Sequence, residues 1–193
     1  EIIVIEPAWP AYKDCALNAG IKVRTIKTTL ETRWLPSVDQ INNAINENTK
    51  MIVLNYPNNP TGKILPHKLL DDIVQTAKEH DLYVLSDEIY YEYFVGGGLG
   101  RGRFNPGYVP DVETYGYEKS IIIDSFSKSH AMTGFRIGYV VAEPSIIEKM
   151  SKLQALSLTN VPEPIQYVAL QALKAYDAIF ENKKIIESRL ESL

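Results

Sequence analysis

The sequence predicts an α/β fold with a mainly parallel sheet. Short apolar runs rich in β-branched residues, which are typical of buried strands, alternate along the chain with longer segments of helical spacing. Strands that alternate with helices in this way usually form a parallel sheet with the helices on its faces. The chain has 193 residues, of which 45% are hydrophobic and 23% are charged, and this length suits one sizeable domain or most of one.

Six apolar runs predict the strands of the sheet. They lie at residues 2–5, 21–26, 51–54, 82–85, 121–123 and 137–141. Five of these runs are almost continuously apolar, as expected for strands that are buried on both faces. The run at 21–26 alternates apolar and polar residues, which indicates a strand nearer the edge of the sheet.

The segments between these runs predict helices. They lie at residues 12–19, 37–46, 66–78 and 144–156, with one or two more after residue 164. Gly20 ends the first of them, and Ser37 is a favourable N-cap for the second. In the third, apolar side chains recur on one face, which indicates packing against the sheet.

Composition and charge exclude several classes of protein. The net charge is −4 and the charges are interspersed, so we expect no nucleic-acid partner. We expect no membrane contact and no secretory leader, and therefore a cytoplasmic protein. The single cysteine, Cys15, excludes an internal disulfide, and we expect it to be buried. The three histidines share no metal-ligand spacing, so we predict no metal site.

Two further features concern the limits of the chain and one loop. The chain begins with Glu1 rather than Met, so we expect it to be part of a longer protein. Residues 96–103 contain a G-x-G-x-G pattern, but no strand precedes it and no helix follows it. We therefore predict a mobile loop there rather than a dinucleotide site.

An unusual set of polar residues lies between the last two predicted strands. Residues 125–139 contain Lys128, with Ser125 and Ser127 just before it, and Arg136. A partly desolvated lysine at the end of a strand can attack a carbonyl, and an arginine with hydroxyl groups can hold a phosphate. This set suggests a lysine that forms a Schiff base with a phosphorylated aldehyde. The alternative is an ordinary lysine in a solvated loop.

Other polar or aromatic residues follow the remaining strands. Trp9 follows the first predicted strand, Asn59 the third and Asp87 the fourth, whereas 125–128 follows the fifth. In parallel sheets, ligands bind beyond the carboxyl ends of the strands. We therefore expect these residues to converge at one edge of the sheet.

Three short sequence motifs, taken in their order along the chain, resemble those of one enzyme family. Residues 59–62 read Asn-Pro-Thr-Gly, residues 86–90 read Ser-Asp-Glu-Ile-Tyr, and residues 125–128 read Ser-Phe-Ser-Lys, with Arg136 eight residues after the lysine. Their order and spacing resemble the pyridoxal-phosphate-dependent aminotransferases of fold type I, class I/II, the group that includes aspartate aminotransferases. The resemblance covers essentially the whole chain, which would be roughly the central half of a full-length member.

The resemblance also implies a domain organisation. It implies a three-layer α/β/α arrangement with a mainly parallel, mixed sheet, which is the large cofactor-binding domain of these enzymes. Residues 1–160 would form the major part of that domain, and residues 161–193 would be a helical segment that leads toward a small domain.

By the same resemblance, four residues would act at the cofactor ring. Lys128 would hold pyridoxal 5′-phosphate as a Schiff base and later move the substrate proton. Asp87 would pair with the protonated ring nitrogen. Asn59 and Tyr90 would hydrogen-bond the phenolate oxygen of the ring. We assign catalytic roles to Lys128, Asp87 and Tyr90.

Four more residues would bind the cofactor without taking part in the chemistry. Ser125, Ser127 and Arg136 would grip the phosphate, the arginine through its bidentate fork. Trp9 would stack on the ring, as in aspartate aminotransferases. The resemblance further implies cis peptide bonds before Pro7 and Pro60.

The ring-binding residues also have plain structural interpretations. Asp87 could be a helix N-cap, Asn59 an ordinary turn residue, Tyr90 a packed core side chain and Trp9 a buried structural residue.

The function implied is that of an aminotransferase in amino acid metabolism. It would transfer an amino group between an amino acid and a 2-oxo acid, in a parent protein that is a homodimer. We expect the chain alone to be inactive, because no residue here matches the arginine that binds the substrate carboxylate. The alternatives are a pyridoxal-phosphate lyase or decarboxylase of the same fold, and the cofactor-binding effector domain of a transcription regulator.

Overall fold

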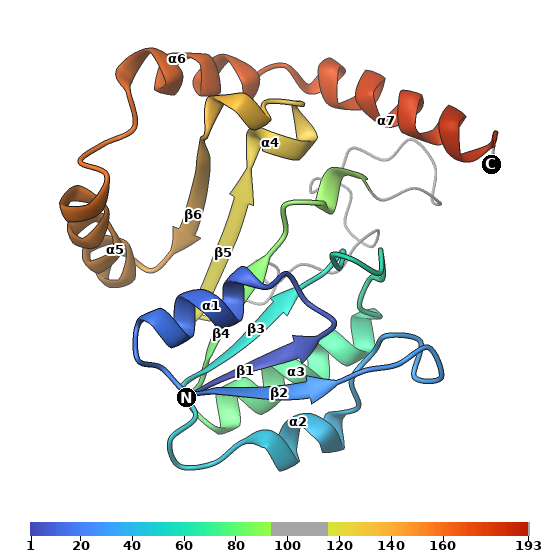
Figure 1. Ribbon diagram of the computed structural model, residues 1–193, viewed down its shortest axis with the longest axis vertical. Helices are drawn as coiled ribbons and strands as arrows, with labels where there is room; N and C mark the ends of the chain where they lie inside the picture. Colours follow the sequence, from blue (N-terminus) through green and yellow to red (C-terminus); the bar gives the residue numbers. More distant parts are fainter. Residues whose placement is uncertain (94–115, 193) are drawn as a thin grey trace.

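A six-stranded sheet forms the centre of the molecule (Figure 1). The computed structural model describes residues 1–93 and 116–192, so the glycine-rich segment 96–103 lies outside the described residues. The strands follow one another across the sheet in the order β2-β1-β3-β4-β5-β6. Their bounds are β1 Ile2–Glu6, β2 Val23–Lys27, β3 Met51–Asn55, β4 Tyr83–Asp87, β5 Ser120–Ser125 and β6 Gly138–Ala142.

The pairing of the strands confirms the predicted sheet. The pairs β1–β2, β1–β3, β3–β4 and β4–β5 are parallel, and β5–β6 is antiparallel, so the sheet is mixed but mainly parallel. The alternating run at 21–26 corresponds to β2, which is at the edge of the sheet as predicted. Each predicted strand is present, with its ends shifted by at most two residues. The predicted burial of the run at 137–141 was wrong, because β6 is an edge strand and all of its residues are at least partly exposed.

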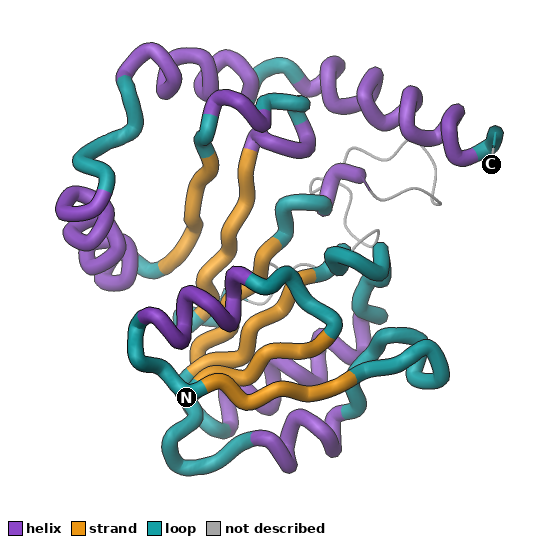
Figure 2. Tube along the Cα trace, viewed as in Figure 1, coloured by secondary structure: helices purple, strands orange, loops and turns teal. Residues whose placement is uncertain are grey.

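Helices cover both faces of the sheet, which confirms the three-layer arrangement (Figure 2). In the view of Figure 1, α1 lies in front of the sheet, α3 lies behind it, and α2 lies below β2. The α-helices are α1 Ala11–Asn18, α2 Val38–Ala44, α3 His67–Glu79, α4 Phe126–Ser129, α5 Pro144–Ser157, α6 Glu163–Ala172 and α7 Tyr176–Leu190. The short helices are η1 Tyr91–Tyr93 and η4 Thr133–Phe135.

Three of these elements were not predicted. One is η1, and the other two, the α4 helix and η4, lie within residues 125–139, where the sequence indicated only a polar connection. A helix of four residues spans barely more than one period of 3.6 residues, so no apolar side chain can recur within it and periodicity could not reveal it. This helix carries Lys128.

The main hydrophobic core lies between the sheet and the helices α2 and α3. Its fully buried members include Ile3 and Ile52 from the sheet, Ile41 from α2, and Leu70 and Ile73 from α3. A second cluster joins Phe126 of α4 to Ala169 of α6 through Met132 and Ile137. The first core fixes the parallel strands, and the second holds the lysine-bearing helix in place.

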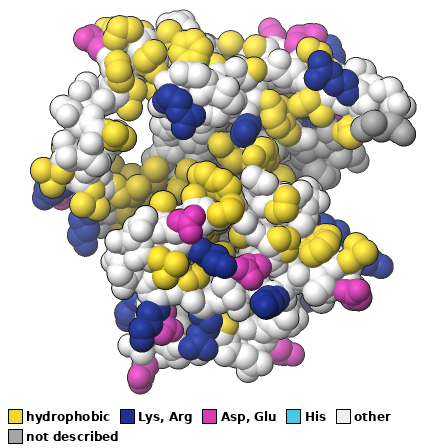
Figure 3. Space-filling view, viewed as in Figure 1, with side chains coloured by type: hydrophobic (Ala, Val, Ile, Leu, Met, Phe, Trp, Pro, Cys, Tyr) yellow, Lys and Arg dark blue, Asp and Glu magenta, His cyan; other side chains and the backbone are white. Residues whose placement is uncertain are grey.

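The α5 helix contributes little to either core. All of its residues are at least partly exposed, including Met150, Leu153 and Leu156. Figure 3 shows hydrophobic side chains gathered on the outside of α5 and α6. Among the described helices, none has both the length and the apolar character needed to cross a membrane.

The predicted burial of Cys15 was wrong. Its side chain is exposed, and the buried residue of α1 is its neighbour Ala16. Successive residues of a helix point about 100° apart, so a helix that buries a single narrow stripe exposes the residue next to it.

The N-terminus of α2 offers a test of the fold. The Ser37 hydroxyl accepts a hydrogen bond from the Gln40 amide at 3.1 Å, and the Gln40 side chain accepts one from the Ser37 amide at 2.9 Å. Ser37→Ala removes one of these two bonds, so we expect the free energy of unfolding to fall by about 1 kcal/mol. Urea unfolding followed by circular dichroism measures this change.

Ser157 supplies the matched control. It is exposed at the end of α5, where its hydroxyl donates to the Leu153 carbonyl at 2.9 Å. Ser157→Ala should change the free energy of unfolding by less than about 0.5 kcal/mol. Equal effects of the two substitutions would contradict a stabilising role for the Ser37 cap.

Candidate active site

The site begins where two neighbouring parallel strands end. The register pairs Asn55, the last residue of β3, with Asp87, the last residue of β4. Both residues are buried, and the Asn55 side-chain amide donates to the Asp87 main-chain carbonyl at 3.2 Å. The two strand ends are therefore tied together at the carboxyl edge of the sheet, where ligands bind in folds of this class.

A cavity of about 210 Å³ opens at this edge. It contains five of the eight residues for which the sequence predicted a role: Trp9, Asn59, Asp87, Tyr90 and Lys128. The other lining residues are Tyr12, Asn55 and Ile89. The predicted convergence is confirmed for Trp9, Asn59, Asp87 and Lys128, which are up to 119 positions apart in the sequence. It is not confirmed for Ser125 and Ser127, which do not line the cavity.

Asp87 is the buried acid of this cavity. One carboxylate oxygen, Oδ2, accepts a hydrogen bond from the Tyr12 hydroxyl, and the other, Oδ1, accepts one from the Ile89 amide at 3.2 Å. Burial raises the pKa of Asp87, and the nearby Asp124 adds to that rise, whereas both hydrogen bonds oppose it. The result is a desolvated carboxyl group that would be stabilised as an anion by a cationic ligand.

Lys128 reaches the cavity from α4. Its Nζ atom lies 5.6 Å from the centre of the Tyr90 ring, which is within range of a cation–π contact. The backbone of Lys128 is held as well, because the Tyr93 hydroxyl donates to its carbonyl oxygen. Tyr93 therefore does more than fill space in the core, and it fixes the segment that presents the lysine.

Asn59 and Tyr90 lie side by side, as their predicted shared role requires. The Asn59 side-chain amide donates to the Tyr90 hydroxyl at 3.5 Å. The backbone of Asn59 is anchored in turn, because its amide donates to the Asn55 side chain at 3.0 Å. The two polar groups therefore point into the same part of the cavity.

The loop that carries Asn59 is joined to the loop that carries Trp9. The Asn58 side chain donates to the Pro7 carbonyl at 3.1 Å. The peptide bonds before Pro7 and Pro60 are cis, as predicted, and a third cis bond, before Pro57, was not predicted.

Trp9 forms an open wall of the cavity. Half of its surface is exposed, so it is not a buried structural residue. Its ring meets that of Tyr12 edge-to-face, with 5.6 Å between the ring centres. One face of the indole is thereby left available for a flat ligand.

The three predicted phosphate ligands do not line this cavity but lie around the start of α4, next to it. Ser125 is the N-cap of α4, and its hydroxyl lies 3.0 Å from both the Ser127 hydroxyl and the Ile137 carbonyl. Arg136 is exposed and donates to the Thr133 carbonyl at 3.0 Å. Its φ of 53° is unusual for a residue other than glycine, and such strain is common at ligand sites.

Two lining residues were missed at the sequence level. Tyr12 lies in the first turn of α1, three residues after Trp9, and this short spacing could have placed both at the same site. Asn55 is the last residue of its strand and resembles the turn formers that follow it, so the sequence carried no distinguishing signal for it.

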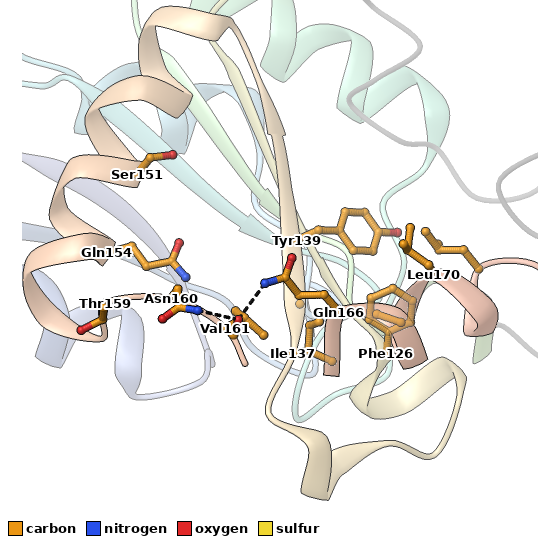
Figure 4. Close-up of a pocket in the computed structure, with 13 residues that line it drawn as sticks. Phe126, Ile137, Tyr139, Ser151, Gln154, Thr159, Asn160, Val161, Gln166 and Leu170 are labelled. Carbon is orange, nitrogen blue, oxygen red and sulfur yellow. Dashed lines mark hydrogen bonds between the residues drawn. The ribbon is translucent and has the colours of Figure 1, made fainter. Parts of the chain in front are cut away.

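A larger cavity, of about 540 Å³, lies between β6, α5 and α6 (Figure 4). Two polar side chains that line it, Gln166 and Asn160, both donate to the Val161 carbonyl, as Figure 4 shows. The residues that line it include no Asp, Glu, Lys, Arg or His. The smaller cavity, with a buried carboxyl group and a lysine, is therefore the candidate active site.

The described residues show no cluster of three or more His, Cys, Asp or Glu side chains that could hold a metal. His130, which is close to Lys128 in the sequence, instead packs against the second core. Its Nε2 atom lies 2.9 Å from the Ala172 carbonyl, and burial lowers its pKa.

Comparison with known proteins identifies aminotransferases as relatives of this chain. An aspartate aminotransferase from Pyrococcus horikoshii is 34% identical over all of this chain, which covers 50% of that protein. An asparagine–oxo-acid transaminase from Streptococcus mutans is 36% identical, also over all of this chain and 48% of its own length. The chain therefore spans about half the length of the relatives it matches.

Solved structures agree with this result. The aspartate aminotransferase of Thermus thermophilus with maleate has a TM-score of 0.85 and 31% identity over 97% of this chain and 48% of its own. An aromatic aminotransferase from Pyrococcus horikoshii has the same TM-score, with 32% identity over 97% of this chain and 49% of its own. In a comparison with sequence models of protein families, the model described as "Aminotransferase class I and II" matches residues 1–193. The chain belongs to the class I and II aminotransferase family.

Proposed function

We propose that the protein containing this chain is a pyridoxal-phosphate-dependent aminotransferase that moves an amino group between an amino acid and a 2-oxo acid. The observation that carries the proposal is the presence of Asp87 and Lys128 in one cavity, with Trp9 as an open aromatic wall. Because the chain spans about half the length of its relatives, the activity is proposed for the whole protein.

The donor set of the cavity fits this cofactor, which members of the family use. The cofactor has a ring nitrogen that can be protonated, an aldehyde, a phenolic oxygen and a phosphate. The buried Asp87 suits the cationic nitrogen, the Lys128 amine suits the aldehyde, and the exposed face of Trp9 suits the flat ring. When bound, the cofactor supplies an electron sink for the electrons released at the substrate α-carbon.

Asp87 and Lys128 would each act on a different proton. Asp87, as an anion, would hold a proton on the ring nitrogen. Lys128 would bind the cofactor aldehyde covalently through Nζ, and its amine would also be the base that takes the proton from the substrate α-carbon. The contact between Tyr93 and the Lys128 backbone would keep the amine in place for both roles.

The remaining residues would bind and orient. Asn59 and Tyr90 would hydrogen-bond the phenolic oxygen of the ring, which suits their adjacent positions. Ser125, Ser127 and Arg136 would hold the phosphate beside α4. We also propose a cytoplasmic homodimer, which the sequence composition and the family resemblance support.

Reductive trapping tests the role of Lys128. Borohydride treatment of the full-length protein with pyridoxal phosphate, followed by digestion and mass spectrometry, should place the added mass on Lys128. Lys119 is the comparison within the same chain, because it is held by Asp81 at 2.5 Å and lies outside the cavity. Equal labelling of Lys119 and Lys128 would rule out the proposed attachment. So would a Lys128→Ala variant that takes up as much label as the unsubstituted protein.

Asp87→Asn tests the role of the buried acid. Asparagine keeps the shape of the side chain but loses the negative charge, so we expect kcat for amino transfer to 2-oxoglutarate to fall by roughly 100- to 1,000-fold. Asp14→Asn is the control, because Asp14 is exposed on α1. The proposal fails if Asp87→Asn keeps kcat within about threefold of the unsubstituted protein.

The same assay separates the alternative reactions. A lyase or decarboxylase would release ammonia or carbon dioxide without forming glutamate from 2-oxoglutarate. The effector domain of a regulator would bind the cofactor without turnover. The names of the relatives favour amino transfer over both alternatives.

A further inference from the structure

Tyr12 lies in the candidate active site, but the proposed function gives it no contact with the cofactor. It is the second residue of α1, and its hydroxyl reaches across to Asp87 at the end of β4, 75 positions later in the sequence. It also lines the cavity and supports Trp9 edge-to-face. A residue in this position can act on the cofactor only through the groups that it touches.

The charge of the Asp87 carboxyl group depends on a balance of opposing effects. Burial and the Asp124 carboxylate on β5 favour the protonated form, whereas the Tyr12 hydroxyl and the Ile89 amide favour the anion. The other titratable groups that line the cavity are the Lys128 amine and the Tyr90 hydroxyl. Within residues 1–93 and 116–192, the donors to this carboxylate are the Tyr12 side chain and the Ile89 main-chain amide.

Tyr12 is suited to act as a permanent donor. Burial, together with the neighbouring Asp87 carboxylate, raises the pKa of Tyr12, so its hydroxyl keeps its proton throughout the physiological range. A hydrogen bond to a charged acceptor is among the stronger ones in proteins, and it is worth most where water is excluded.

We propose that Tyr12 is a positioning residue that keeps the Asp87 carboxylate ionised and aimed into the cavity. The inference rests on the proposed function, because an ionised Asp87 matters for a ligand with a cationic ring nitrogen. Without the Tyr12 hydroxyl, one carboxylate oxygen loses its donor and the buried group takes up a proton more readily. A protonated Asp87 cannot pair with a protonated ring nitrogen.

Tyr12→Phe tests this directly, because phenylalanine keeps the aromatic contact with Trp9 and removes only the hydroxyl. In the full-length, cofactor-free protein labelled with ¹³C at the aspartate carboxyl carbons, the Asp87 signal is assigned by its loss in Asp87→Asn. We expect Tyr12→Phe to raise the pKa of Asp87. An unchanged titration would overturn the proposal.

Tyr56→Phe is the matched control. The Tyr56 hydroxyl is on a buried ring, whereas Tyr12 is partly buried; the partner of Tyr56 is the Trp34 carbonyl at 3.4 Å, and Tyr56 does not line the cavity. This substitution should leave the Asp87 titration unchanged. An equal rise in both variants would mean that the effect is general to the loss of a buried hydroxyl, and would contradict the proposal.

The affinity for pyridoxal phosphate provides a second, independent measurement. At pH 6.5 we expect Tyr12→Phe to bind roughly tenfold more weakly, as expected for the loss of a hydrogen bond to a charged group. Because a raised Asp87 pKa leaves less of the anion at low pH, the difference from the unsubstituted protein should narrow as the pH rises to 8.5. A purely structural role for Tyr12 predicts the same difference at both values.

A double-mutant cycle completes the test. In the Asp87→Asn background, Tyr12→Phe should have little further effect on affinity, since its effect passes through the carboxylate. Equal effects in both backgrounds would overturn the proposal. If the Asp87 titration responds to Tyr12→Phe but the protein neither labels at Lys128 nor transfers amino groups, then the proposed function fails and the coupling of Tyr12 to Asp87 stands.

Discussion

The site depends on the parallel pairing of β3 with β4. This register brings Asn55 and Asp87 side by side at the same edge of the sheet, and the Asn55 amide ties the two strand ends together. Asn55 also holds the backbone of Asn59, so the loop after β3 is positioned relative to the acid at the end of β4. A slip of β3 by one residue would turn Asn55 to the other face of the sheet, and the loop after β3 would lose its anchor beside the acid.

A second constraint is electrostatic. The edge of the sheet holds a carboxyl group that burial disfavours as an anion, and the surroundings only partly compensate for that cost. A structure optimised for stability alone would place an apolar residue at this position. The carboxyl group is instead retained with two donors and a cavity in front of it, which is the pattern expected where a fold gives up stability for the binding of a cationic ligand.

Much of the fold could be read from local patterns, because burial on both faces of a parallel sheet demands continuous apolar runs. The edge position of β2 and the cap at Ser37 were equally local and were predicted correctly. The exposure of Cys15 was not, since it depends on how narrow a stripe α1 buries. The four-residue helix that presents Lys128 was also missed, because it is held by contacts with α6 rather than by its own sequence pattern. The domain boundary at residue 160 stays a prediction.

The sequence by itself determined which polar and aromatic residues follow each strand along the chain. The order of these residues is what resembles the family. Only the tertiary structure decided which of these residues share a cavity. Asp87 and Lys128 line the same cavity, whereas Arg136 lies outside it. Tyr12 lines the cavity as well, and its proposed role depends on a hydrogen bond to Asp87, 75 positions away in the sequence. Contacts between distant segments depend on register and helix packing, which no local pattern of residues encodes.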